Sequence, residues 1–286
     1  MKLMNTKIMS LLLCASAIIA SSCSGNNEEI IPGSSSLKIK TAISSTRAVI
    51  ETENFSYEDE IGIFALNEEG TAYSKESMNM TGMYVGDNQW NIDPELFLTE
   101  QKAVIYAYYP YSSSNQAPAT VNVNIMPNYH KTIKGQIDYL YGQGEADAAY
   151  PEANITFNHA LARVTFLIKK EETDAGKGIL SKIILRNTSN NTVIATSGTM
   201  DIRTGEITPK TNEDAAITLT GDYELNSNKE EKIDFLVIPA QISDNTVELA
   251  LTVDDGIYII TLPATVWEKG QQYTYPVTIS RKQSHT

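Results

Sequence analysis

The chain has 286 residues, a hydrophobic fraction of 42% and a formal net charge of −13. This length and apolar content can supply one or two domains with buried cores, and two are expected. An acidic chain is repelled by phosphates, which argues against nucleic acid or anionic lipid as a partner.

The first 22 residues have the pattern of a secretory signal peptide. Lys2 and Lys7 supply its positive charge, residues 8–20 are mostly apolar, and small residues up to Ser22 lead directly into Cys23. The apolar run is shorter than the roughly 20 residues that cross a bilayer. Small residues before a cysteine resemble the lipobox of bacterial lipoproteins, which predicts cleavage between Ser22 and Cys23 and lipidation of Cys23. An ordinary signal cut nearby, with Cys23 left free, is the alternative.

Residues 23–36 are expected to form a flexible tether. They are mainly Ser, Gly, Asn, Glu and Pro, and such a composition buries too little apolar surface to offset the entropy of ordering. Cys14 lies in the signal peptide and Cys23 is the lipid candidate, so no pair remains for a structural disulfide. The folded part must therefore be stabilised by its core.

A strand is expected immediately after the tether. Alternate residues are apolar or β-branched there, which is typical of a half-buried strand: Leu37, Ile39, Thr41 and Ile43. Leu37, Ile39 and Ile43 are predicted to face the core. A polar break follows and contains Arg47 and Ala48.

Further β signals recur at short intervals, and no stretch keeps a helical period for three turns, so helices are expected to be minor. The predicted strands include residues 61–66, 103–108, 121–125, 161–168, 183–185, 235–238 and 247–253. Gly86-Asp87 and Asp255-Gly256 predict hairpin turns, since positive φ favours such residues. Many short strands indicate β-sandwiches, here a domain at 37–150 and a second at 151–286.

The last predicted strand runs from Gln272 to Ser280. One of its faces presents the alternating residues Tyr273, Tyr275, Val277 and Ile279. Pro276 cannot donate to a ladder and therefore favours a sheet edge or a mobile donor strand. A closing strand of the second domain and a strand donated to a neighbouring molecule are the two alternatives.

Catalytic and metal-binding patterns are weak. His130, His159 and His285 are far apart in the sequence, and no cysteine completes a zinc site, so no metal or other cofactor is predicted. His159 is interpreted as a satisfied strand residue. Gly142-Gln143-Gly144 lacks the spacing of a phosphate loop and is interpreted as a turn, and the acidic runs at 58–60 and 254–255 are interpreted as solvated turns. The chain is not expected to be an enzyme.

Several blocks resemble the fimbrillin family of Bacteroidales type V pili. They are spread over nearly the whole mature chain, and in the first of them Glu58-Asp59 replaces the usual Gly-Asp. The blocks are Thr46-Arg47-Ala48 with Phe55 and 57–65, Asp138-Tyr139-Leu140-Tyr141, residues 157–164, and residues 267–277.

The resemblance implies two transthyretin-like β-sandwich domains in a pilus subunit of the outer membrane and fimbrium. It implies cleavage between Arg47 and Ala48 by a trypsin-like protease, which removes the lipidated tether and the first strand, with its residues Leu37, Ile39, Thr41 and Ile43. The partners would be other pilus subunits, joined by strand exchange, and the outer membrane through the precursor's lipid. A tip or accessory role is favoured over a stem role.

Two other classes stay open. A surface glycan-binding or adhesive lipoprotein, with a host or bacterial surface ligand, would share the leader and the sandwiches but keep its lipid. The 15 tyrosines could then include an exposed aromatic strip that stacks on sugars. An enzyme would need a cleft with converging carboxylates, and no pattern in the sequence predicts one.

Overall fold

The period-two alternation of the sequence appears directly in the strands. In β11 (Glu152–His159), Ala153, Ile155 and Phe157 are buried while Glu152 and the other intervening residues are more exposed. Neighbouring residues of a strand point to opposite faces of a sheet, so such a segment buries one face only. The expected all-β class is confirmed for the part of the chain described by the computed structural model, residues 34–44, 54–126, 128–130, 136–172 and 176–280.

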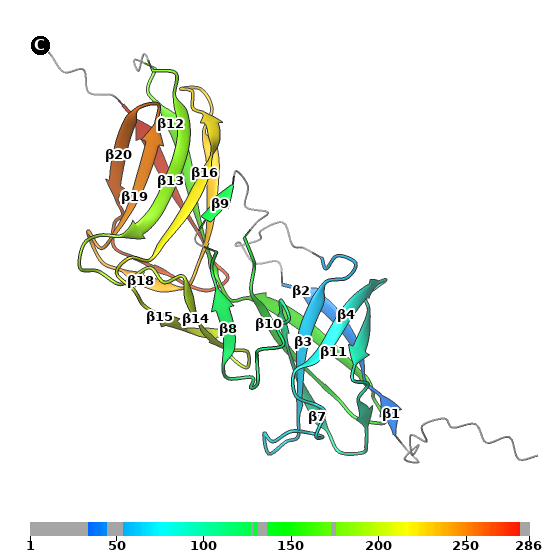
Figure 1. The fold of residues 1–286 in the computed structure, drawn as a ribbon. Helices are drawn as coiled ribbons and strands as arrows, with labels where there is room; N and C mark the ends of the chain where they lie inside the picture. Colours follow the sequence, from blue (N-terminus) through cyan, green and yellow to red (C-terminus); the bar gives the residue numbers. More distant parts are fainter. Residues whose placement is uncertain (1–33, 45–53, 127, 131–135, 173–175, 281–286) are drawn as a thin grey trace, which may run out of the picture. The chain divides into compact units, whose positions relative to one another are not determined.

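The strands succeed one another without an intervening helix among these residues (Figure 1). In chain order they are β1 (Ser35–Ser36), β2 (Lys38–Ile43), β3 (Glu60–Leu66), β4 (Met80–Gly86), β5 (Gln89–Asp93), β6 (Phe97–Leu98), β7 (Ala103–Tyr109), β8 (Val121–Asn124), β9 (Asn128–His130), β10 (Leu140–Ala146), β11 (Glu152–His159), β12 (Ala162–Lys170), β13 (Ile179–Asn187), β14 (Ser197–Asp201), β15 (Glu206–Lys210), β16 (Ala216–Glu224), β17 (Glu231–Val237), β18 (Ala240–Ile242), β19 (Val247–Val253), β20 (Gly256–Thr261), β21 (Thr265–Trp267) and β22 (Gln272–Ile279).

The first large sheet has the order β2-β11-β10-β7-β3-β4-β5. Its neighbours are antiparallel except for β2, which runs parallel to β11. The apolar side chains of this sheet form one buried cluster, which includes Ile61, Ile63, Ile105 and Phe157. The two edge strands β2 and β5 approach each other, and Trp90 of β5 donates a hydrogen bond to Thr41 of β2, so the sheet curls.

Two further sheets share a second buried cluster. A three-stranded sheet has the order β17-β12-β22, and a five-stranded sheet has the order β20-β19-β13-β16-β9. Phe166 of β12 and Phe235 of β17 lie in the same cluster as Ile183 of β13 and Leu251 of β19. Two sheets that bury their inner faces against each other form a β-sandwich.

Strand pairing crosses the domain boundary expected between residues 150 and 151. β11 follows that boundary, yet its partners β10 and β2 precede it. In the opposite sense, β8 pairs with β14 and β9 with β16. The described residues between Ser34 and Ser280 belong to one compact unit, and the division into two domains stays a prediction.

Two local expectations need correction. Gly142, Gln143 and Gly144 do not form a turn, because they lie within β10, paired with β7. A Cβ on Gly142 would lie 2.6 Å from the carbonyl oxygen of Thr156, so glycine is needed there for the close approach of β11. The hairpin between β19 and β20 is confirmed, but its turn is Asp254-Asp255 and the positive φ of 49° belongs to Asp254.

Candidate functional site

The first long strand, β2, is the candidate functional element. Along one side it pairs with β11 over its whole length, from Lys38 opposite Glu152 to Ile43 opposite Phe157. Leu37 and Ile39 are only 4% and 2% exposed in the first cluster, and Ile43 packs against that cluster. Burial of each such side chain stabilises the fold by about 1.5–3 kcal/mol. The strand therefore fills an apolar groove.

The chain that enters β2 is also held by backbone pairing. β1 pairs antiparallel with β6, so that Ser35 lies opposite Leu98. The backbone N–H of Leu37 donates to the carbonyl of Leu96 at 2.8 Å, and the hydroxyl of Ser35 donates to the carbonyl of Ala148 at 2.9 Å. The segment from Ser35 to Ile43 thus connects β6 on one side of the groove to β11 on the other.

The free edge of β2 contacts the turn between β4 and β5. The backbone N–H of Thr41 donates to the side-chain oxygen of Asn88 at 2.8 Å, and the amide of Asn88 donates back to the carbonyl of Thr41 at 2.9 Å. The indole N–H of Trp90 donates to the Thr41 hydroxyl at 3.2 Å. The Asn88 side chain therefore satisfies backbone hydrogen-bonding groups on the edge of β2 that a further strand would otherwise pair with.

Asn88 can take this position because of its backbone conformation. Asp87 and Asn88 form the turn with φ values of 50° and 55°, as a type I′ hairpin requires. Aspartate and asparagine tolerate this left-handed region better than other non-glycine residues. The hairpin was predicted from Gly86-Asp87, but the contact with Thr41, 47 positions away, had no sequence signal.

A buried ion pair lies beside the end of β2. Ser44 donates its backbone N–H to the carbonyl of Phe157, two residues before His159. His159 Nδ1 is 2.6 Å from Asp138 Oδ2, with the two side chains 2% and 4% exposed. Burial alone would lower the pKa of His159, but the hydrogen bond and the charge of Asp138, helped by the backbone of Ser44, raise it overall.

This pair departs from the expectation for His159. His159 does end a strand, but it lies in a buried ion pair, and the Oδ1 of Asp138 is buried without a hydrogen-bond partner. A second buried pair joins β12 and β17 of the three-stranded sheet: Arg163 donates to both carboxylate oxygens of Asp234 at 2.9 and 2.6 Å. Burial raises the pKa of Asp234, and the bonds from Arg163 and Thr165 more than reverse this and leave it lowered. Neither pairing was predicted from the sequence.

The residues expected at the processing sites are not part of the described structure. Ser22, Cys23, Arg47 and Ala48 all lie outside the described residues, so their roles remain predictions. Ser44 is the last described residue before the segment that contains Arg47, and Asn54 is the first after it.

The last strand, β22, lies at the edge of its sheet and runs parallel to β12. Val277 and Ile279 are buried in the second cluster, and Tyr273 and Tyr275 pack against it. The indole of Trp267 donates to the hydroxyl of Tyr275 at 3.0 Å. Pro276 lies in this edge strand, where its missing N–H costs no ladder bond on the open side.

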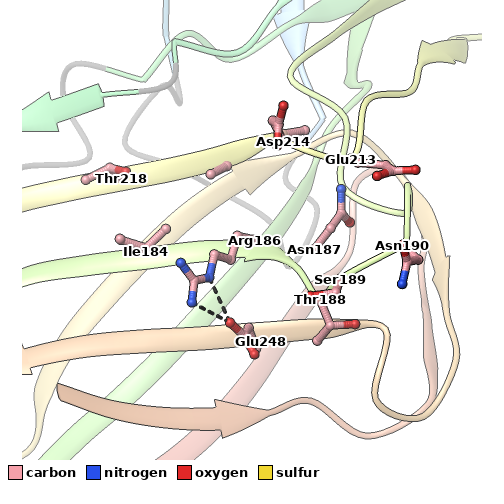
Figure 2. Close-up of a pocket in the computed structure, with 12 residues that line it drawn as sticks. Ile184, Arg186, Asn187, Thr188, Ser189, Asn190, Glu213, Asp214, Thr218 and Glu248 are labelled. Carbon is pink, nitrogen blue, oxygen red and sulfur yellow. Dashed lines mark hydrogen bonds and ion pairs between the residues drawn. The ribbon is translucent and has the colours of Figure 1, made fainter.

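A hollow with a volume of about 670 Å³ lies near the ends of β13, β16 and β19. Figure 2 shows that Arg186 of β13 points toward Glu248 of the neighbouring strand β19, and the two side chains form an ion pair of 2.7 Å. Its lining residues are polar or aliphatic and include no aromatic ring on which a sugar could stack. The hollow therefore offers a polar surface without an evident catalytic arrangement.

The described ranges contain neither a metal-ligand cluster nor a membrane-spanning helix. No group of three or more His, Cys, Asp or Glu side chains is placed to hold a metal ion there. None of the described residues belong to a helix long and apolar enough to span a membrane.

The fold and the site define a β-sandwich protein whose first long strand lies in an apolar groove. Residues 46–286 match the fimbrillin-like family, and the chain belongs to that family. The comparison with curated proteins gives no match.

Solved structures show the same fold. One, described as a cell adhesion protein from Bacteroides uniformis, has a TM-score of 0.65 at 20% identity and covers 87% of this chain and 95% of its own. A similarly described protein from Bacteroides ovatus has a TM-score of 0.64 at 17% identity, covering 86% and 92%. A fimbrial protein from Bacteroides vulgatus has a TM-score of 0.54 at 13% identity, covering 85% and 95%.

Proposed function

We propose that this chain is a structural subunit of a type V pilus, assembled on the cell surface by β-strand complementation. Its precursor would be exported as a lipoprotein anchored in the outer membrane through Cys23. Cleavage between Arg47 and Ala48 would release the anchor together with β2. Membership of the fimbrillin-like family supports a role in assembly and adhesion rather than in catalysis.

The observation that carries the proposal is the mode of attachment of β2. The strand is held by main-chain pairing with β11 on one side, while on the other side Asn88 and Trp90 contact it through side chains. A strand at a sheet edge can leave without disrupting a ladder on both sides. The predicted cleavage site at Arg47 follows it within a few residues of Ile43.

Removal of β2 would leave an energetically unfavourable groove. The edge of β11 would lose its main-chain partner, and the pockets of Leu37 and Ile39 would be exposed to water. An extended segment of another subunit with apolar residues at alternate positions would restore both kinds of contact, as in other cases of strand addition. Polymerisation would thus recover the stabilisation that cleavage removes.

The burial of β22 supports a tip or accessory position. Use of β22 as the donated strand would require Val277 and Ile279 to leave the second cluster. A strand that completes its own core is a costly donor. A stem subunit would need β22 to exchange despite this cost.

N-terminal sequencing of the surface-exposed protein tests the proposal. We expect a start at Ala48 in the wild type, and a lipid-bound, non-polymerising precursor in the variant Arg47→Ala. Arg203→Ala is the control, because Arg203 is an exposed arginine elsewhere, paired with Asp201. Filaments from Arg47→Ala equal to those of the wild type would refute processing at this site.

A synthetic peptide spanning Ser35–Ser44 tests the groove itself. Added to the cleaved protein, it should occupy the vacated site, raise the unfolding temperature and inhibit polymerisation. A peptide with Leu37→Asp and Ile39→Asp is the matched control and should have none of these effects, because both positions are buried. A mature surface protein with a blocked Cys23 would instead indicate the adhesive lipoprotein that keeps its anchor.

A further inference from the structure

β20 is an unprotected sheet edge. Natural edge strands usually carry charges, prolines or bulges that prevent pairing with other chains. Within the described ranges, the other edge strands of at least five residues carry a charged residue or a proline: β2, β5, β15, β17 and β22. β20 has neither, and its sequence is Gly-Ile-Tyr-Ile-Ile-Thr.

The register of β20 identifies the backbone groups that face outward. The N–H of Leu262 donates to the carbonyl of Val247, one position beyond the ladder between β19 and β20. In an antiparallel ladder, hydrogen-bonded pairs alternate with non-bonded ones. The groups of Ile260 and Tyr258 therefore face β19, and those of Ile257, Ile259 and Thr261 face away from the sheet.

The same strand carries the most exposed isoleucines among the described residues. Ile257 is 73% exposed and Ile259 is 57% exposed. Ile259 lies opposite Ala250, which lies opposite Ile184 of β13, so an apolar row crosses the outer face and ends at this edge. Tyr258, between the two isoleucines, points inward and packs against the second cluster.

We propose that β20 pairs antiparallel with β20 of a second copy of this chain, with the two-fold axis at Tyr258. In this register Ile257 lies opposite Ile259 of the second copy, and Ile259 opposite its Ile257. Both are residues whose backbone groups face outward, so each pair forms reciprocal hydrogen bonds. All four exposed isoleucines lie on one face and cover one another.

Charge also favours a second copy at this edge. Two chains of net charge −13 repel each other, so contact is favoured where no like charges meet. In the proposed register Asp255 lies opposite Thr261 of the second copy rather than opposite an acidic residue. The closed two-fold pair uses the β20 edges of both copies at once and leaves neither of them open for further addition.

The contact is expected to be weak for an isolated pair. Two six-residue strands bury less than the ~1,200 Å² of a standard interface, a size typical of weak or transient contacts. We therefore expect a Kd of roughly 10 µM to 1 mM. Subunits held in a filament present many copies side by side, so such contacts would add by multivalency. The inference goes beyond strand complementation, because β20 and β2 belong to different sheets.

Sedimentation equilibrium of the full chain carrying Cys23→Ser tests the pairing without a contribution from lipid. We expect a monomer–dimer equilibrium, slower amide exchange at Ile257 and Ile259 as concentration rises, and at least a tenfold higher Kd for Ile259→Lys and for Ile257→Lys. Thr274→Lys on the edge strand β22 is the matched control and should leave Kd unchanged. Unchanged urea unfolding checks that each variant is folded.

The register has its own variant. With the two-fold axis at Tyr258, the lysine of Thr261→Lys would face Asp255 of the second copy, so this variant should dimerise as well as the parent or better. With the axis at Ile259 instead, the lysine would lie opposite Ile257 of the second copy, and the dimer would be weakened. A protein that stays monomeric up to 1 mM, or a dimer insensitive to lysine on β20, would overturn the proposal. Adding Arg47→Ala to the Cys23→Ser chain should leave this equilibrium unchanged, so its outcome is independent of processing.

Discussion

The side-chain amide of Asn88 pairs with the backbone of Thr41 as a neighbouring strand would: it accepts a hydrogen bond from the Thr41 N–H at 2.8 Å and donates one to the Thr41 carbonyl at 2.9 Å. The pairing joins the edge strand β2 to the turn that precedes the other edge strand of the first sheet, β5. It is therefore a specific contact by which the folded precursor retains β2.

Asn88→Asp should loosen β2. The carboxylate keeps the acceptor for the Thr41 N–H but loses the donor to the Thr41 carbonyl, which it then repels. We expect a loss of about 1–2 kcal/mol in the free energy of unfolding and amide exchange in β2 faster by roughly 5–30-fold. Asp87→Asn, exposed in the same turn with a φ of 50°, should change neither. Equal exchange rates in both variants would contradict the role of Asn88.

The buried pair of Asp138 and His159 should make stability depend on pH. The pKa of His159 is raised above that of the unfolded chain, so the pair's contribution is fully present below the unfolded value of about 6.5 and is lost as pH rises through the folded value. Urea unfolding between about pH 5.5 and 8.5 should show this decrease in the wild type. In Asp138→Asn the buried imidazole favours its neutral form, and the slope should be abolished or reversed. Identical profiles would contradict the assignment.

Gly62→Ala should destabilise the first sheet. Gly62 lies opposite Tyr108, and a Cβ at Gly62 would lie 1.9 Å from Cε1 of that ring. The ring must move, and its hydroxyl then loses its bond to Asn79. We expect a loss of about 1–3 kcal/mol by chemical denaturation. Gly256→Ala, where the nearest atom would be 3.2 Å away, should cost clearly less.

Loss of β22 should distinguish a closing strand from a donated one. Deletion of residues 272–286 removes Val277 and Ile279 from the second cluster, so we expect a protein that does not fold, as judged by circular dichroism. Val277→Asp should weaken folding in the same direction, while Thr278→Asp, exposed on the other face, should not. A truncated protein that folds but no longer supports assembly would favour the donor role.

The features that the sequence predicted correctly are those that depend on neighbouring residues in the chain. The alternation of residues 37–43 and 247–253 predicted strands at β2 and β19, and Gly86-Asp87 predicted the hairpin between β4 and β5. Side-chain period and turn conformation depend on residues close together in the chain, so they can be read without knowing the fold. The signal peptide pattern before Cys23 has the same local character, and its processing stays a prediction.

Only the tertiary structure decided which segments meet. β2 lies on β11 more than a hundred residues later, and Asp138 finds His159 across a strand connection. The glycines of β10 suggested a turn because glycine is common in turns. In the structure they leave space for the close approach of the β11 backbone. Such contacts depend on how segments that are distant in the sequence pack together. Many strand arrangements are compatible with the same alternating pattern, and the packing of one buried core selects among them.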